Sequence, residues 1–209
     1  MKILGVIFDE NLNWKSHITL VENKISKTIG IMYKTKHLLS KKCLKDIYYS
    51  FIHSYISYCN IAWASTSSSA LKKIYIKQKQ ASRVICNMHK CAHAKPLLRE
   101  IKALNVYETN LYQNLLFMFK YQNDMLPKFF NNHFSIISHK YLTRCSIHNF
   151  NLPKSTLKKT DYSISYRGPR LWNRILDDKM KSITVIQSFK NVIKQHLLDL
   201  TDTNILLYF

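Results

Sequence analysis

The sequence LKKIYIKQKQASRVI, residues 71–85, decides the fold of the chain around it. Its apolar residues recur at helical spacing and form one face of a helix. The serines of residues 65–69 precede this segment and offer side chains that can cap the helix N-terminus. We therefore predict a helix that buries one face against other helices. The apolar positions are Leu71, Ile74, Ala81, Val84 and Ile85.

The other faces of this predicted helix are basic. No Asp or Glu occurs between Asp46 and Glu100, so these cations have no carboxylate close to them in sequence. Lysine and arginine bind phosphate backbones by displacing condensed counterions, which makes the helix a candidate backbone clamp. A solvated basic face without a ligand is the alternative interpretation. The candidate nucleic-acid-binding residues here are Lys72, Lys73, Lys77, Lys79 and Arg83.

Two further helices are predicted on the N-terminal side of this segment. An apolar stripe at spacings of three and four begins after Ser16, and a second, wider stripe follows Ser40. The short apolar run from Ile3 to Phe8 is typical of a strand that leads into a turn. Together these patterns predict a strand element followed by a three-helix bundle.

The stretch from Ile47 to Ala64 is long and uncharged enough to raise the question of a membrane span. It also contains His53, Asn60 and several Ser and Tyr residues, whose polar groups are costly in hydrocarbon. We therefore predict a buried core helix of a globular domain and no membrane association.

The chain beyond residue 90 is predicted to form a second helical unit. A proline suits the first turn of a short helix over residues 96–104, and Asn105–Glu108 has the pattern of a capping box that opens a longer helix. That helix should end before Leu126-Pro127. Residues 128–168 are less regular, and a final amphipathic helix starts at Thr184.

The segment Arg167-Gly168-Pro169-Arg170 is predicted to be a rigid, exposed basic turn, because Gly and Pro interrupt regular structure. Arg167 and Arg170 are therefore candidate RNA contacts, with a corner packed beside Trp172 as the open alternative. For Trp63 and Trp172 we predict core positions in preference to base stacking, since each lies in an apolar neighbourhood.

The charge of the chain indicates a polyanionic partner. The 209 residues contain 32 Lys and Arg against 12 Asp and Glu, a net charge of +20, and 46% of them are hydrophobic, enough for a folded core. Aromatic residues make up 12% and offer surfaces on which bases can stack. Nucleic acid is the predicted partner class, ahead of solubility alone or an anionic membrane surface.

Cysteine usage and the N-terminal residues bear on the compartment. The five cysteines are irregularly spaced and do not form the pattern of a disulfide framework. The chain does not open with the pattern of a secretory signal peptide. We expect an intracellular protein, located in the cytoplasm, the nucleus or both.

No cluster of residues predicts catalysis by this chain. Metal-dependent phosphoryl transfer needs converging carboxylates, and the only adjacent acidic pairs, Asp9-Glu10 and Asp177-Asp178, lie at expected turns or helix edges. Four possible zinc ligands occur within eight residues, a spacing tighter than zinc modules usually show. We expect no catalytic residue, metal, cofactor or small-molecule ligand. The possible zinc ligands are Cys86, His89, Cys91 and His93.

Short segments along the chain resemble, in order, the C-terminal part of reverse transcriptases from non-LTR (LINE-type, jockey-like) retrotransposons. Each motif is weak by itself, and their shared order carries the resemblance. The matching segments are Lys2-Ile3-Leu4-Gly5-Val6, Asp9 to Ile18, Tyr48 to Trp63, Leu71 to Ile85, His93 to Leu97, His139 to Arg144 and Tyr166 to Asn173.

The resemblance implies a truncated piece of an RNA-directed DNA polymerase of a mobile element. The family's catalytic aromatic-Ala-Asp-Asp turn belongs to the palm domain and would lie before residue 1, so the Mg²⁺ site of the parent enzyme has no counterpart here. The expected partners are a template–primer hybrid of RNA and DNA and the missing palm. The chain itself is expected to be inactive.

The expected fold is mainly α, with a short N-terminal β-hairpin, a three-helix thumb-like bundle and a second helical C-terminal unit. By this interpretation residues 1–15 are a residual primer-grip hairpin, 16–90 the thumb-like bundle and 91–209 the helical C-terminal region. The predicted function is nucleic-acid binding within a reverse transcriptase. The alternatives are a non-catalytic protein-interaction remnant of a decayed element and a zinc-dependent module.

Overall fold

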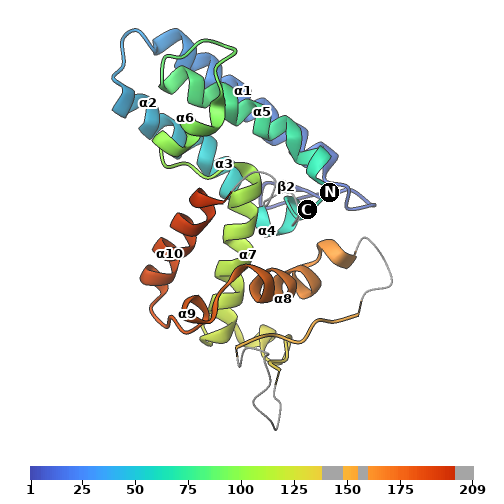
Figure 1. Ribbon diagram of the computed structural model, residues 1–209. Helices are drawn as coiled ribbons and strands as arrows, with labels where there is room; N and C mark the ends of the chain where they lie inside the picture. Colours follow the sequence, from blue (N-terminus) through green and yellow to red (C-terminus); the bar gives the residue numbers. More distant parts are fainter. Residues whose placement is uncertain (138–147, 155–159, 201–209) are drawn as a thin grey trace. The chain divides into compact units, whose positions relative to one another are not determined.

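The computed structural model of the chain describes residues 1–137, 148–154 and 160–200 (Figure 1). It is mainly helical with a short antiparallel N-terminal sheet, which confirms the predicted fold class. The described chain forms two compact units, Met1–Asn110 and Leu111–Leu200. This division falls within a helix, whereas the boundary predicted from sequence is residue 90. The segment His139 to Arg144 lies outside the described residues.

The first unit begins with a hairpin of two very short strands, β1 (Lys2–Ile3) and β2 (Val6–Ile7). This confirms the predicted N-terminal hairpin, but the strand expected over Ile3–Phe8 is interrupted, because the chain reverses at Leu4 and Gly5. Both residues have positive φ, 45° and 85°, as a two-residue type I′ turn requires. Glycine adopts this conformation without strain, and its place after Leu4 permits the tight turn.

Helix α1 (Lys15–Thr35) lies beside α5 (Ser68–Ile85), as Figure 1 shows. Ile25, Met32, Leu71 and Ile74 are completely buried, so the two helices share an apolar core. This agrees with the stripes predicted from sequence. The residue at the start of α5 is Ser67, as the serine run suggested, but its hydroxyl contacts Ser69 and does not cap the helix backbone.

The middle of the first unit is a helical run that starts with α2 (Lys41–Ile47), capped by Ser40. It continues through the π-helical turn η1 (Tyr48–His53) and α3 (Ser54–Ser57). The run supplies Ile52 and Ile56 to the core. No helix of the described chain is both long enough and apolar enough to cross a membrane.

The uncharged stretch is interrupted after α3, where Cys59 adopts a left-handed conformation with φ 50° and the short α4 (Asn60–Trp63) begins. Side chains satisfy the carbonyls left at this break. Trp63 donates its indole N–H to the Tyr58 carbonyl at 2.8 Å, and Asn60 donates to the Ile56 carbonyl at 2.8 Å. Trp63 is completely buried, which confirms its predicted core position.

Helix α6 (Ala94–Glu100) packs on α5 within the first unit. It starts and ends earlier than predicted, and Lys102 takes up a left-handed conformation just beyond its end. The next helix, α7 (Val106–Gln122), opens with the predicted capping box. Asn105 Oδ1 accepts the N–H of Glu108 at 3.0 Å, and Glu108 Oε2 accepts the N–H of Asn105 at 2.8 Å.

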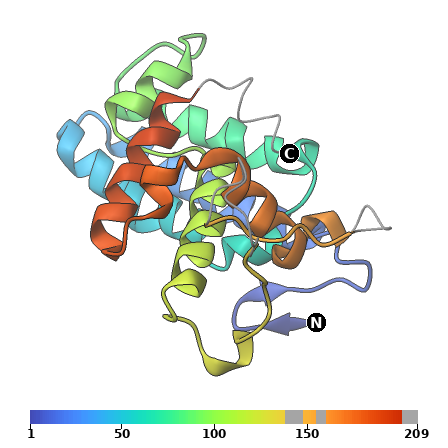
Figure 2. The same ribbon diagram turned by 60° about the horizontal axis from the view of Figure 1, so that its bottom comes forward.

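The second unit contains the remainder of α7 together with α8 (Ile164–Ile175), α9 (Asp178–Lys181) and α10 (Ile186–Asp199). The short 3₁₀ turns η2 (Lys128–Phe130) and η3 (Thr160–Tyr162) also belong to it. Its core stacks the rings of Phe119 and Phe189 at 4.2 Å, and Trp172 lies 5.9 Å from Phe189. Helices α8 and α10 flank α7 in both views (Figure 1 and Figure 2).

Helix α8 contradicts the predicted turn at Arg167-Gly168-Pro169-Arg170, because these residues lie inside it. Ser163 caps its start, and Leu171 and Ile175 are buried on one face. Gly168 is needed for close packing: a Cβ at this position would lie 2.6 Å from the sulfur of Met118. The Gly-Pro pair therefore marks a tight helix contact here and not a turn.

Candidate nucleic-acid interface

The four lysines of α5 lie away from the face that the helix buries. Lys72 and Lys73 are exposed, and Lys77 and Lys79 are half-buried. Their spacing along a helix of 3.6 residues per turn places them in two adjacent rows. Lys72 and Lys79 share one row with Arg83, and Lys73 and Lys77 form the other.

The ammonium group of Lys79 lies 4.5 Å from the centre of the Tyr75 ring. This cation–π contact holds the charge beside the helix surface. The Tyr75 ring is packed edge-on against Tyr107 at 5.5 Å, and Tyr107 donates a hydrogen bond to the Ser68 carbonyl at 2.9 Å. One lysine of the basic face is thus oriented by a fixed aromatic pair.

Arg83 differs from the four lysines because part of its guanidinium is already used. Its Nε donates a hydrogen bond of 2.8 Å to the carbonyl of Ala92, in the loop between α5 and α6. Arg83 is half-buried by this contact. We therefore assign it a structural role in holding the loop, in addition to the charge that it adds to its row.

The first two carboxylates that follow these lysines in sequence have other partners. Glu100 pairs with Lys41, and this hydrogen bond lowers the pKa of Glu100 and raises that of Lys41. Glu108 pairs with Arg99 at 2.6 Å. Within residues 1–137, 148–154 and 160–200, no ion pair joins a lysine of α5 to a carboxylate. The positive charge of this face is therefore not neutralised locally.

The four possible zinc ligands of residues 86–93 do not converge. Cys86 directs its thiol to Glu100 Oε2 at 3.6 Å, and burial raises its pKa. His89 Nδ1 instead accepts the N–H of Cys91 at 3.3 Å. In the part of the chain that the structure describes, no three His, Cys, Asp or Glu side chains are grouped so that they could hold a metal ion.

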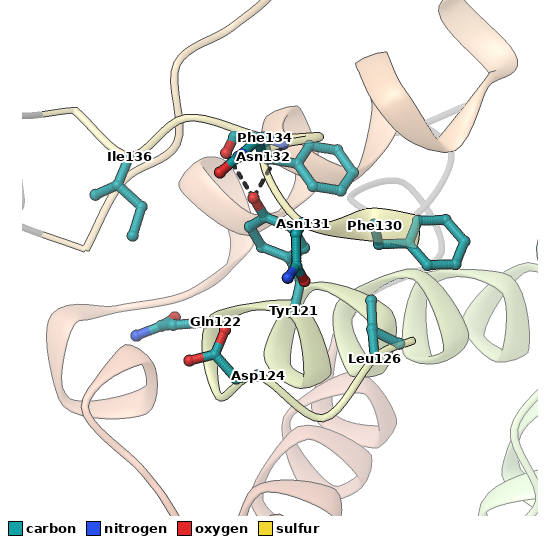
Figure 3. A pocket seen from close by; sticks show the side chains of 9 residues that line it. All are labelled: Tyr121, Gln122, Asp124, Leu126, Phe130, Asn131, Asn132, Phe134 and Ile136. Atoms are coloured by element: carbon teal, nitrogen blue, oxygen red, sulfur yellow. Dashed lines mark hydrogen bonds between the residues drawn. The ribbon is translucent and has the colours of Figure 1, made fainter. Parts of the chain in front are cut away.

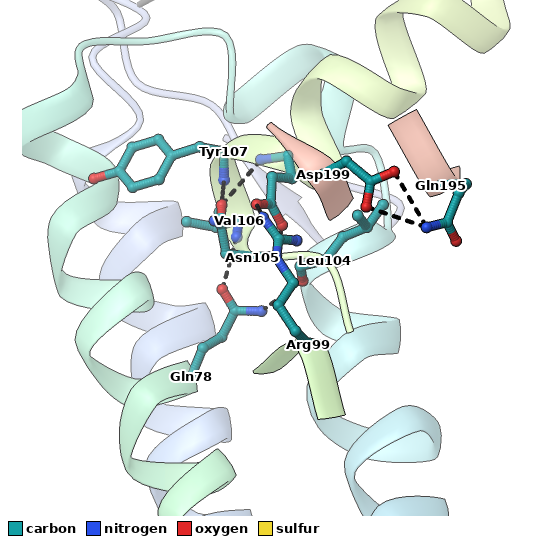
Figure 4. Close-up of polar contacts among 9 residues, drawn as sticks. Gln78, Arg99, Leu104, Asn105, Val106, Tyr107, Gln195 and Asp199 are labelled. Carbon is teal, nitrogen blue, oxygen red and sulfur yellow. Dashed lines mark hydrogen bonds and ion pairs between the residues drawn. The ribbon is translucent and has the colours of Figure 1, made fainter. Parts of the chain in front are cut away.

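Gln78, which is not among the residues predicted from sequence to be functional, holds the inner side of α5 in place. It is completely buried, and its side-chain oxygen accepts the N–H of Val106 at 2.7 Å. Its nitrogen donates to the hydroxyl of Tyr48 at 3.0 Å and to the carbonyl of Leu104 at 3.2 Å. Figure 4 shows this amide facing the start of α7. The sequence does contain a signal for this role, because Gln78 is a polar residue at a position of the predicted apolar helix face.

Several residues that carry the family resemblance are buried parts of the fold. In the α5 motif, Leu71, Ile74, Gln78 and Ala81 are completely buried. In the Tyr48–Trp63 motif, the Trp63 indole and the Asn60 amide donate hydrogen bonds to backbone carbonyls at the break between α3 and α4. Asn110 also donates to Asn60 Oδ1 at 3.1 Å. The motifs therefore coincide with packing and hydrogen-bonding positions of the first unit.

Arg167 and Arg170, the candidate sites of the second unit, occupy different environments in α8. Arg167 is 4% exposed, and burial lowers its pKa to about 10. Arg170 is exposed and lies 3.7 Å from Asp161 Oδ1. The prediction that both arginines are exposed is wrong for Arg167, because the helix turns it toward the core.

Trp172 is completely buried beside these residues, and its indole N–H donates to the carbonyl of His148 at 3.0 Å. This confirms the predicted core position of Trp172.

The chain was compared with models of protein families, with curated proteins and with solved structures, and none of them matches it.

Proposed function

We propose that the first unit binds a nucleic-acid backbone through the outer face of α5. One observation carries this proposal: Lys72, Lys73, Lys77 and Lys79 lie on one side of a single helix and have no carboxylate partner among the described residues. Concentrated positive charge of this kind costs self-repulsion in a free protein, and a phosphate backbone relieves it.

The dimensions of the basic face suit a run of phosphates. From Lys72 to Arg83 the helix advances about 16 Å at 1.5 Å per residue. One strand of a duplex advances about 3.4 Å per nucleotide, so the face spans roughly five phosphates. Lysine contacts of this type position a protein on nucleic acid without reading its sequence. We therefore propose sequence-independent binding.

We propose, on the ordered resemblance, that this binding serves a reverse transcriptase of a non-LTR mobile element. In that setting the first unit acts as the thumb, its ligand is the template–primer hybrid of RNA and DNA, and the palm that it serves carries the catalytic carboxylates. The proposal for this chain is binding and not polymerisation. The shared order of the sequence motifs supports this part of the proposal.

We further propose that the N-terminal hairpin is the surface that the palm covers. Met1 and Leu4 are 81% and 84% exposed, and Ile3 is 44% exposed. The turn is fixed to the rest of the unit, because Tyr58 donates its hydroxyl to the Leu4 carbonyl at 2.7 Å. A two-stranded hairpin is marginal alone, and a partner sheet would stabilise it.

Charge reversal tests the α5 proposal. We expect Lys72→Glu, Lys73→Glu, Lys77→Glu and Lys79→Glu together to weaken binding to an RNA–DNA hybrid at least 100-fold near 0.1 M salt. The dependence of log Kd on log salt should also become shallower, by up to about 0.9 for each phosphate that the variant no longer binds. Arg83 is left intact because its bond to Ala92 supports the loop. Fluorescence anisotropy across a salt series measures both quantities.

A matched control reverses four lysines that are exposed elsewhere: Lys34, Lys42, Lys128 and Lys179. This variant has the same net charge as the first, so it separates a local contact from the field of the whole chain. We expect it to lose less than tenfold in affinity. Equal losses in the two variants, or an unchanged salt slope in the α5 variant, would contradict the proposal.

A further inference from the structure

The second unit contains a pocket of about 470 Å³ between the end of α7 and the segment that follows it through η2. Its volume falls within the range of small-molecule sites, roughly 300–1,000 Å³. Figure 3 shows its lining, which includes aromatic rings and polar side chains. The residues that matter here are Tyr121, Gln122, Asp124, Phe130, Asn131 and Phe134.

The aromatic part of the lining is held in position before any ligand binds. The Tyr121 hydroxyl donates to the Phe134 carbonyl at 2.7 Å and accepts the Phe134 N–H at 3.2 Å. The two rings are packed edge-on at 4.8 Å, and Phe130 is packed edge-on against Phe117 at 5.3 Å. Such rigid aromatic surfaces bind flat rings at a low cost in conformational entropy.

The polar part of the lining offers hydrogen-bond acceptors. The side-chain nitrogen of Gln122 donates a hydrogen bond to the Lys181 carbonyl at 3.4 Å, and its side-chain oxygen remains as an acceptor for a ligand. That oxygen is buried and has no hydrogen-bond partner in the described part of the chain. Figure 3 shows the Asp124 carboxylate on the same side of the pocket as Gln122. A buried acceptor without a partner costs about 1–3 kcal/mol, which a donor on a ligand can recover.

These acceptors select the ligand by charge and by hydrogen bonding. A phosphate group is disfavoured next to the Asp124 carboxylate, because both are anionic. A neutral planar ring that carries N–H donors fits both the aromatic walls and the two acceptors. An amino group on a nucleobase is such a donor, and carboxylates accept from the amino group of cytosine in known recognition geometries.

We propose that this pocket holds one unpaired nucleobase with an exocyclic amino group, which donates to Gln122 Oε1 and to the Asp124 carboxylate. The ring contacts Tyr121 and Phe134, and its sugar and phosphate stay outside. As part of a bound single strand, this contact rests on the proposed nucleic-acid function. It adds base selectivity to the sequence-independent binding of α5.

Cytosine and uracil test the proposal because they differ in an amino group against a carbonyl at one position. We expect an all-cytidine 12-mer to bind the full chain about 5- to 10-fold more tightly than an all-uridine 12-mer at pH 7.5. Asp124→Asn combined with Gln122→Met should bring this ratio close to one and leave the salt slope unchanged. Asn tolerates the left-handed backbone of residue 124, where φ is 52°.

The α5 lysine variant distinguishes the two proposals. It should bind both oligonucleotides weakly and still prefer cytidine. If the wild-type chain binds neither the 12-mers nor the RNA–DNA hybrid, the proposed function fails, and the pocket is then tested directly with cytidine and uridine by NMR. Shifts of the Gln122 side-chain amide with cytidine alone support the pocket. Equal binding of the two 12-mers by the wild-type chain, or no nucleoside-induced shift, overturns it.

Discussion

The basic residues of α5 and those of α8 differ in what surrounds them. The α5 lysines extend from the outer side of the helix and have no carboxylate partner among the described residues, while the opposite face is buried through Leu71, Ile74 and Gln78. In α8, Arg167 is turned into the core and Arg170 faces solvent beside Asp161. A cluster of basic residues in sequence is a candidate binding surface only where the helix exposes their side chains and no carboxylate pairs with them.

The largest effect is expected on the inner face of α5, at Gln78. Gln78→Leu removes the hydrogen-bond partners of Tyr48, Leu104 and Val106 in a buried site. We expect the free energy of unfolding to fall by about 3 kcal/mol, because each stranded buried group costs about 1–3 kcal/mol. Urea denaturation followed by circular dichroism measures the change.

Gln80→Leu is the control, since Gln80 is exposed on the same helix. We expect it to change stability by less than about 0.5 kcal/mol. Comparable stability losses in both variants would mean that α5 has no such division between its inner and outer faces.

A smaller effect separates the two arginines of α8. Arg167→Ala should lower the free energy of unfolding by about 2 kcal/mol because the packing of its buried stem is removed, whereas Arg170→Ala should change it by less than about 0.5 kcal/mol. Neither variant should change affinity for an RNA–DNA hybrid more than twofold. A tenfold loss of affinity in Arg170→Ala would restore the predicted RNA contact in α8.

The smallest expected effect is a pH dependence of stability that arises where His17 contacts the N-terminal hairpin. His17 Nδ1 accepts the N–H of Ile7 at 3.3 Å, and burial, with a further contribution from Lys24, lowers the pKa of His17 below its usual 6.5. The neutral form is favoured in the folded chain, so its stabilisation is complete above pH 6.5 and is lost as pH falls toward the lowered pKa.

We therefore expect the urea concentration at the midpoint of unfolding to decrease as the pH is lowered from 7.5 to 5.5. The decrease should be smaller in His17→Asn. Equal pH dependence in the two proteins would show that another group is responsible. The effect is small because only one histidine is involved and the backbone hydrogen bond that it accepts is long.

Local signals in the sequence predicted much of the fold. Periodic apolar positions located α1, α5 and α10, and the Asn105–Glu108 pattern located the start of α7. These features depend on residues within a few positions of one another. The two core tryptophans followed from their apolar surroundings.

Features that depend on distant residues were not predictable in this way. Helix α8 includes a Gly-Pro pair because Gly168 allows α8 to pack against Met118, which is far away in sequence. The burial of Arg167 follows from that helix. The role of Gln78 is set by Tyr48 and by the residues before α7. In the candidate site, sequence identified the charges of α5, and structure was needed to show that Arg83 also holds a loop.

The hydrogen bonds of Gln78 also bear on how the first unit folds. They join positions separated by 30, 26 and 28 residues, so they form only after three segments have been brought together. Contacts that are absent from the folding transition state act mainly on the unfolding rate. We therefore expect Gln78→Leu to speed unfolding more than it slows folding, so that this buried amide affects the lifetime of the folded unit more than the speed at which it forms.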